Sequence, residues 1–292
     1  MNAFENRNPA VIAIYYLSVI AVLMLSQNPI LLLLCFFGAF FHSLLTGGRK
    51  NTRAYLFYLL LFLLLALINP VFSHNGKTVL FVLNDAPITL EAIVYGAVSA
   101  GVIVTVLLLF RSFTEIMSRD KLLYVFGKLS PKLALILSMG LRYVPLFKER
   151  AGKIKESQRA LGLYKEENVF DKIKCDLRVF SILITWALEN GITTADSMSA
   201  RGYGRGRRSY YSLFKFRASD AVILTLTLLC VALTLIGMAL GTLDFDFYPS
   251  LVMSQITPLG MISYTAYGIL TMLPIFTETE ERIKWKYLQS KI

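Results

Sequence analysis

The residues best suited to a specific polar contact lie between Arg111 and Arg217. This segment holds 21 of the chain's 30 basic residues and 10 of its 19 acidic residues. Within it, Arg201 stands between Ala200 and Gly202, where a helical pattern ends. An arginine presents five N–H donors in a rigid fork, which fits carboxylates and carbonyls inside a protein groove. The simpler interpretation is a basic residue that complements the C-terminal end of a helix dipole.

A second stretch of the same segment ends in a similar way. Arg159 precedes the tripeptide Ala160-Leu161-Gly162, which follows another charged helical pattern. Two amphipathic helices with matching tips would suit a pair of equivalent pockets on a dimeric partner. The chemistry expected at these positions is therefore docking to soluble proteins.

Residue patterns for catalysis and for metal or nucleotide binding are missing from the sequence. It has no HExxH and no GxxxxGK[ST], and His42 and His74 are too few for a histidine-built metal site. The three cysteines, Cys35, Cys175 and Cys230, lie far apart without a CxxC pair, so we expect them to be apolar fillers. We predict no catalytic residue, no metal ligand and no cofactor.

The composition is that of a membrane protein. Hydrophobic residues make up 55% of the chain and charged residues 17%, whereas about a quarter of a soluble domain is charged. The first apolar run has no basic leader or small-residue cleavage site, so we expect it to remain as a span. A helix needs about 20 mostly apolar residues to cross a bilayer. Six segments are candidates: Ala10–Leu25, Pro29–Leu45, Ala54–Phe72, Thr89–Phe110, Ala218–Leu240 and Leu251–Phe276.

The distribution of charge predicts the orientation, because basic residues near span ends mark the cytoplasmic side. Arg49, Lys50 and Arg53 lie between the second and third spans, and Asp244 and Asp246 lie between the last two. Both termini are therefore expected in the cytoplasm, at the cell membrane. The basic segment is expected on the same side. An alternative use of its charge is simple anchoring to anionic lipid, at about 1 kcal/mol per basic residue.

Two long helices are predicted within the basic segment. The first begins at Ser130-Pro131, a hydroxyl cap followed by proline at the first helical position. Pro145 lies inside this helix and should bend it, so we interpret it as a hinge. The second helix has an apolar stripe with helical spacing. The stripe consists of Val169, Ile173, Leu177, Phe180, Ile184, Ala187, Gly191 and Met198.

These patterns predict an all-α polytopic membrane protein with about six transmembrane helices and a cytoplasmic segment of two long amphipathic helices. We divide the chain into N-terminal transmembrane helices at residues 1–112 and a cytoplasmic helical segment at residues 113–217. C-terminal transmembrane helices follow at residues 218–276, and a cytoplasmic tail at residues 277–292.

The stretch from Asn69 to about Arg208 resembles the transmembrane (T) component of energy-coupling factor transporters, which are importers of the ATP-binding-cassette (ABC) type. The order of the matching passages agrees with the family, and the last of them is the most specific. They are Asn69-Pro70-Val71-Phe72-Ser73-His74-Asn75-Gly76, Leu141-Arg142-Tyr143-Val144-Pro145, Ser157-Gln158-Arg159-Ala160-Leu161-Gly162 and Ala195-Asp196-Ser197-Met198-Ser199-Ala200-Arg201-Gly202-Tyr203-Gly204.

The resemblance implies a role for each tip. In that family, two cytoplasmic coupling helices each end in an Ala-Arg-Gly-like motif that docks on one of two ATPase subunits. Ala200-Arg201-Gly202 corresponds to the second tip and Ala160-Leu161-Gly162 to the first. Leu161 stands where the family usually has arginine, so either Arg159 supplies the charge or the first contact is apolar.

The resemblance also implies the partners of the chain. A separate small membrane protein, the S component, captures the substrate and rests on the apolar side of the coupling helices. The chain would then be a non-catalytic subunit, with ATP hydrolysis in the ATPases. The implied substrate is a vitamin or a transition-metal ion.

Three other functions are open from the residues alone. A membrane-embedded enzyme would need ionisable groups at membrane depth, but Glu91 and His42 fall near span ends, where we expect interface residues. An ion-gradient-driven secondary transporter often shows internal repeats, and none is evident between the two halves. Nucleic-acid binding could use Arg205, Arg207 and Arg208 beside tyrosines. Positive-inside anchoring explains these arginines better, so we predict contact with the lipid bilayer and none with nucleic acid.

Overall fold

A computed structural model describes residues 4–47, 52–72, 76–83, 86–164, 169–206, 214–254 and 257–289. Arg49, Lys50, His74, Arg207 and Arg208, which entered the predictions above, lie outside these ranges. The chain divides into two compact units. We call Met1–Val125 with Phe214–Ile292 the span unit, and Phe126–Leu213 the crossed-helix unit.

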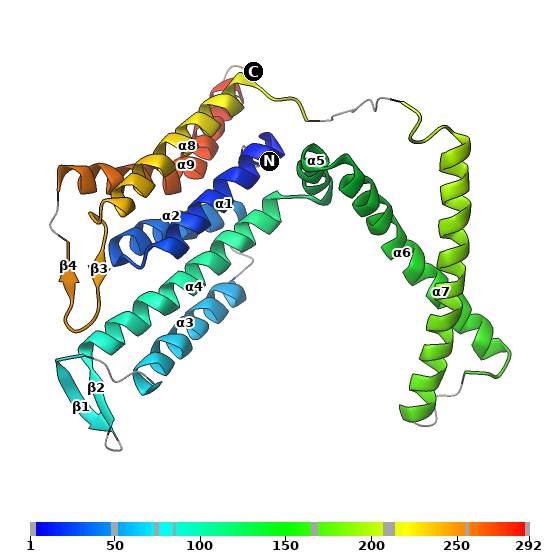
Figure 1. Ribbon diagram of the computed structural model, residues 1–292, viewed down its shortest axis with the longest axis horizontal. Helices are drawn as coiled ribbons and strands as arrows, with labels where there is room; N and C mark the ends of the chain where they lie inside the picture. Colours follow the sequence, from blue (N-terminus) through cyan, green and yellow to red (C-terminus); the bar gives the residue numbers. More distant parts are fainter. Residues whose placement is uncertain are drawn as a thin grey trace. The chain divides into compact units, whose positions relative to one another are not determined.

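The span unit is built mainly from helices (Figure 1). Within the described residues, α3, α4, α8 and α9 are long and apolar enough to cross a membrane, and α1 and α2 are shorter apolar helices. The prediction of a polytopic, helical membrane protein is confirmed. The elements are η1 (Phe4–Asn6), α1 (Pro9–Leu25), α2 (Pro29–Gly47), α3 (Thr52–Phe72), α4 (Leu90–Ile116), α8 (Ala218–Ala239) and α9 (Pro258–Gln289), and α5 (Arg119–Leu129) begins in this unit.

Two short hairpins lie between helices of the span unit. Strands β1 (Val79–Leu83) and β2 (Ala86–Thr89) pair antiparallel between α3 and α4. Strands β3 (Phe245–Asp246) and β4 (Val252–Met253) pair between α8 and α9. The last span was therefore predicted to start too early. It begins at Pro258, whose fixed φ and missing N–H suit the first position of a helix.

Close approach of the helices holds the span unit together. α2 packs against both α4 and α9, and α3 packs against α4. A Cβ at Gly96 would lie 2.9 Å from the carbonyl oxygen of Ala66, and a Cβ at Gly38 would lie 2.9 Å from that of Thr271. Larger side chains at these positions would push the helices apart.

The two ionisable residues considered for membrane chemistry have structural environments. Glu91 lies in the first turn of α4, and its Oε2 accepts a hydrogen bond of 2.7 Å from the Thr78 hydroxyl. His42 lies near the end of α2 and is buried inside the span unit, at 3% exposed. The turn η1 places Phe4 beside it, with ring centroids 6.2 Å apart.

Candidate functional site

The crossed-helix unit consists mainly of α6 (Pro131–Ala160) and α7 (Val169–Ala200), which cross in Figure 1. The ring centroids of Phe147 and Trp186 are 6.0 Å apart. On one side of this contact, the Tyr143 and Thr194 hydroxyls are 3.3 Å apart. A residue later in α6 thus contacts a residue earlier in α7, so the two helices run antiparallel. Their C-terminal tips therefore lie at opposite ends of the pair.

The separation of the tips follows from the contacts near the first one. Tyr164, just beyond the end of α6, donates a hydrogen bond of 2.8 Å from its hydroxyl to Asp176 Oδ1. The first tip therefore lies beside this turn of α7. Arg201 follows 25 residues later in the chain. At about 1.5 Å per helical residue, the two tips are roughly 37 Å apart.

The first tip ends in a Schellman motif, in which two backbone N–H groups turn back onto the last helical carbonyls. Leu163 N–H donates to the carbonyl of Gln158, and Gly162 N–H donates to that of Arg159, each at 3.0 Å. Gly162 has a φ of +69°, a left-handed conformation that glycine adopts without steric cost.

The second tip has the same backbone arrangement. Tyr203 N–H donates to the Met198 carbonyl and Gly202 N–H to that of Ser199, each at 3.0 Å, with Gly202 at a φ of +79°. α8 ends in the same motif at Gly241, so the motif by itself only terminates a helix. The distinctive property of the two tips is the side chain that each exposes.

Leu161 and Arg201 occupy equivalent positions, each directly before the left-handed glycine. Leu161 is 72% exposed, and the Arg201 side chain is exposed. Among the described residues, no hydrogen bond or ion pair holds the Arg201 guanidinium. The tip therefore presents a set of N–H donors that a partner protein can occupy.

Arg159 has a different environment from Leu161. Its guanidinium carbon lies 5.2 Å from the ring centroid of Tyr164, within the range of a cation–π contact. Lys155 Nζ lies 4.5 Å from the same centroid. Tyr164 thus fixes two basic side chains beside the first tip. Leu161 is the residue that projects from it.

Sequence reasoning missed the cluster that joins the first tip to α7, which we call the tyrosine clasp: Tyr164, Lys155, Asp176 and Cys175. Tyr164 is buried, Lys155 Nζ lies 3.7 Å from Asp176 Oδ1, and the Cys175 thiol contacts the Leu163 carbonyl at 3.5 Å. The hydrogen bond from Tyr164 and the charge of Lys155 lower the pKa of Asp176. Tyr164 falls outside the helical periodicity, so no local pattern indicated it.

The clasp should weaken in acid. Because the pKa of Asp176 is lowered on folding, the carboxylate stabilises the clasp above the ordinary aspartate pKa, and this contribution is lost as the pH falls through the depressed value. Tyr164→Phe removes the larger cause of the shift, so it should raise the pH at the midpoint of the Asp176 titration. Lys155→Gln should raise the same midpoint by a smaller amount. A carboxyl-carbon NMR titration in micelles measures the midpoint. Equal midpoints in wild type and Tyr164→Phe would contradict the assignment.

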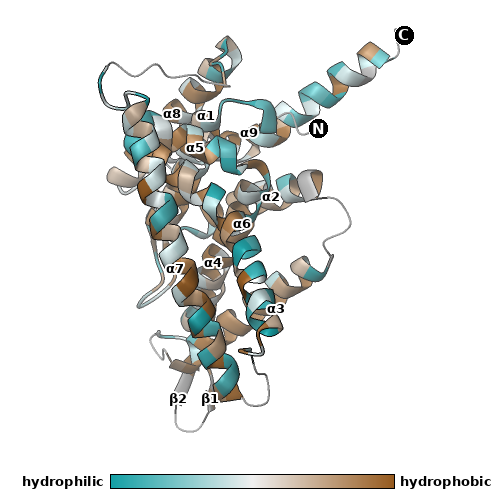
Figure 2. Cartoon of the chain, turned by 90° about the vertical axis from the view of Figure 1, so that its right-hand side faces the viewer, coloured by the Kyte–Doolittle hydropathy of each residue, from teal (hydrophilic) through white to brown (hydrophobic). Residues whose placement is uncertain are grey.

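The apolar stripe of α7 lies on a different face from the seam with α6. The seam contains Cys175 and Val179, which are buried. Ile173, Leu177 and Phe180 are all more than half exposed. At 3.6 residues per turn, the centres of the two faces are about two fifths of a turn apart. Figure 2 shows hydrophobic and hydrophilic residues along α7. The stripe is thus an apolar surface beside the crossing.

The start and middle of α6 agree only partly with expectation. Ser130 is the residue before the helix and Pro131 is its first residue, but the Ser130 hydroxyl makes no capping hydrogen bond. Its extended backbone is the conformation that a following proline favours. Pro145 lies within a helix that continues to Ala160. Its role as a hinge is still a prediction.

Comparison with known proteins places both tips inside one family match. Residues 3–211 match the CbiQ family, described as cobalt transport protein. The energy-coupling factor transporter transmembrane protein EcfT of Listeria innocua is 29% identical over 174 residues, 56% of this chain and 66% of that protein. EcfT of Bacillus subtilis is 31% identical over 105 residues, 35% and 40% of the two chains. EcfT of Lacticaseibacillus paracasei is 32% identical over 93 residues, 31% and 35%.

The aligned regions span between about a third and two thirds of these relatives. The family match is longer and covers well over half of the 292 residues, from the first span through α6 and α7. It confirms the resemblance inferred from the four sequence passages. This polytopic membrane protein belongs to the CbiQ family.

Proposed function

We propose that the protein is the transmembrane coupling subunit of an energy-coupling factor importer. In this role it transmits conformational change from two ABC-type ATPase subunits to a substrate-binding S component. The observation that supports this best is the pair of exposed tips, which have the same backbone geometry at opposite ends of crossed helices. The names of the relatives support the same role.

The mechanism uses the crossed helices as a pair of levers. When the ATPase dimer closes around ATP, the two docked tips are carried toward each other. Phe147, Trp186 and the tyrosine clasp hold the helices together at and near their crossing, so displacement of the tips changes the angle between them. The S component, seated on the α7 stripe, moves with this change. Coupling of this kind requires an element whose equilibrium both binding sites bias.

In the proposed complex, the partner subunits hydrolyse ATP and select the substrate. We assign the protein no catalytic residue, cofactor or metal ligand, and ATP hydrolysis to the ATPases. Substrate selection belongs to the S component, for a vitamin or a transition-metal ion. The family description, which names cobalt, is compatible with the second class.

The proposed orientation follows the positive-inside rule. Residues 113–217 form the coupling segment in the cytoplasm, both termini lie on that side, and the β3–β4 hairpin with Asp244 and Asp246 faces outward. The protein would then reside in the cell membrane with its two tips accessible to soluble ATPases.

The first ATPase contact is expected to be apolar. Leu161→Ala removes three carbons that docking would bury, which should weaken ATPase binding by about 2 kcal/mol, or about 30-fold. Arg159→Ala should have a smaller effect, because its guanidinium is held by Tyr164. Leu133→Ala, at an exposed leucine far from the tip, is the control. The measurement is ATPase affinity for the purified membrane complex, and a larger loss in Arg159→Ala would reverse the assignment.

Purification of the tagged protein from its native membranes tests the proposed function as a whole. We expect two ATPase subunits and a small membrane protein to co-purify, and ATP-dependent uptake after reconstitution. Uptake driven by an ion gradient without ATPases would instead support a secondary transporter. Chemical turnover by the purified chain alone would support an enzyme.

A further inference from the structure

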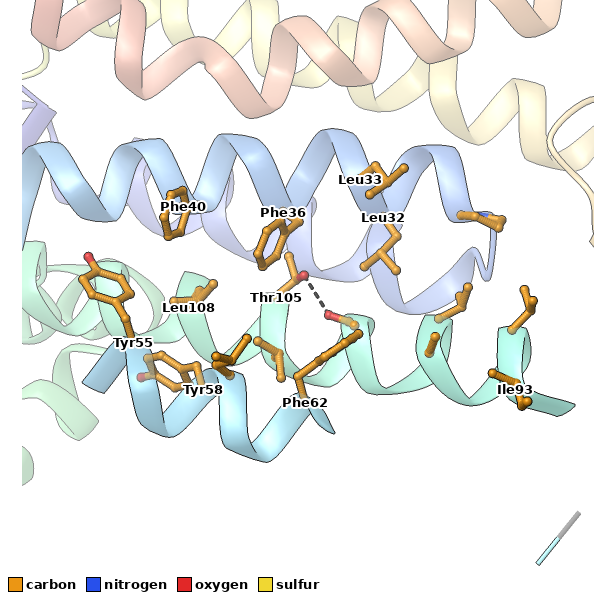
Figure 3. A pocket seen from close by; sticks show the side chains of 17 residues that line it. Leu32, Leu33, Phe36, Phe40, Tyr55, Tyr58, Phe62, Ile93, Thr105 and Leu108 are labelled. Atoms are coloured by element: carbon orange, nitrogen blue, oxygen red, sulfur yellow. Dashed lines mark hydrogen bonds between the residues drawn. The ribbon is translucent and has the colours of Figure 1, made fainter. Parts of the chain in front are cut away.

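A feature of the span unit that the proposed function does not use is an apolar groove. It has a volume of about 600 Å³ and is formed by α2, α3 and α4 (Figure 3). Its wall is aliphatic and aromatic, and Phe36 and Phe62 face it from two different helices. The Thr105 hydroxyl within it is satisfied, because it donates a hydrogen bond of 2.7 Å to the Gly101 carbonyl. The groove therefore offers its occupant an apolar surface.

One end of the groove lies beside an arginine that is paired with a carboxylate. Tyr55 lines this end, and the guanidinium carbon of Arg111 lies 5.4 Å from its ring centroid. Arg111 Nε lies 3.3 Å from Glu115 Oε1, and the Arg111 side chain is 13% exposed. Its Nη1 is buried and has no hydrogen-bond partner among the described residues. A buried charged donor without an acceptor is costly, so this position favours an anionic oxygen.

Arg111 is at the right depth for a lipid headgroup. α4 begins at Leu90, and about 20 residues of helix cross the hydrocarbon layer, so Arg111 lies just beyond it. Arg53 lies in the first turn of α3, two residues before Tyr55, and is exposed. On a helix, residues two apart do not face the same side, so Arg53 points away from Tyr55 and a phosphate at this level would meet Arg111 alone.

We propose that the groove holds an acyl chain of one anionic phospholipid, whose phosphate accepts a hydrogen bond from Arg111. Lipid tails are as apolar as the groove, so the hydrophobic effect does not favour the groove over the surrounding bilayer. Selection must therefore come from the headgroup. One basic residue near an anionic headgroup supplies about a fivefold preference. The lipid would fill the space between α3 and α2 without occupying either tip.

Native mass spectrometry of the full-length protein, exchanged into equal amounts of phosphatidylglycerol and phosphatidylcholine with the same chains, tests the headgroup contact. We expect wild type to retain phosphatidylglycerol with about a fivefold preference. Arg111→Gln should reduce that preference to nearly one while lipid is still retained. Arg119→Gln, an exposed arginine on α5, should leave it unchanged. Equal retention of the two lipids by wild type would overturn the proposal.

A second pair of variants tests the groove. Ala97→Trp places an indole in it and should abolish retention of this lipid, whereas Leu64→Trp, at a half-exposed position of α3 outside the groove, should not. Unchanged retention in Ala97→Trp, with a small membrane protein lost from the purified complex, would assign the groove to a partner helix and overturn the proposal. Arg111→Gln leaves the apolar wall intact, so its result stands even if Ala97→Trp fails to fold.

Discussion

Arg201→Ala is expected to release the ATPase from the α7 tip and to abolish uptake, while membrane insertion stays normal. The loss of a charge-assisted contact in a desolvated groove costs about 2–5 kcal/mol, or about 30-fold to several-thousand-fold in affinity. The tip itself should persist, because backbone groups and Gly202 form its cap. The variant therefore tests the side chain and leaves the end of the helix intact.

The measurement is ATPase binding and ATP-driven uptake in a reconstituted complex. Lys148→Ala is the control, because Lys148 is an exposed basic residue of α6 that adjoins Phe147 at the crossing and lies away from both tips. Arg201→Lys should recover only part of the affinity, since an ammonium lacks the planar fork of a guanidinium. Normal uptake by Arg201→Ala would remove this residue from the mechanism.

Phe180→Asp is expected to affect the other partner: the variant should lose the S component and retain the ATPases. Burial of a phenylalanine is worth about 1.5–3 kcal/mol, and an unpaired buried carboxylate adds a further penalty. A fall in S-component affinity of at least about 100-fold should follow. Phe180 is 58% exposed and lies off the seam, so the contact between α6 and α7 should survive.

Separate pull-downs of the two kinds of partner distinguish these outcomes. Lys172→Asp introduces the same side chain on the exposed charged face of α7 and should leave S-component binding unchanged. Together with Arg201→Ala, the pair would show that the two partners bind different parts of one helix. S-component retention by Phe180→Asp would mean that the stripe has another role.

Local patterns predicted those features that depend on neighbouring residues. Long apolar runs indicated the spans. The glycines of Ala160-Leu161-Gly162 and Ala200-Arg201-Gly202 indicated where α6 and α7 end. The actual start of α9 was not predicted, because Leu251, Val252 and Met253 are apolar and fit a strand as well as a span. Only Pro258 marks the true boundary.

Features that depend on residues distant in the chain could not be predicted in this way. Asn8 donates to the Tyr124 hydroxyl at 3.3 Å across 116 positions, and the turn at Phe4 encloses His42. The contact of Arg111 with Tyr55 likewise joins two helices whose pairing no spacing rule specifies. Such contacts fix the packing of the span unit and its groove, but their residues show no periodic signal.

Site-specific photo-crosslinking in the assembled complex tests the docking of the tips most directly. Tyr203 and Leu163 occupy equivalent positions, one residue beyond the left-handed glycine of each tip, so a crosslinker there leaves Arg201 and Leu161 in place. Thr185, exposed in the middle of α7, is the control. We predict that each tip position crosslinks to an ATPase subunit and that Thr185 does not. Crosslinks from Tyr203 to lipid alone, with the ATPases bound, would contradict the account.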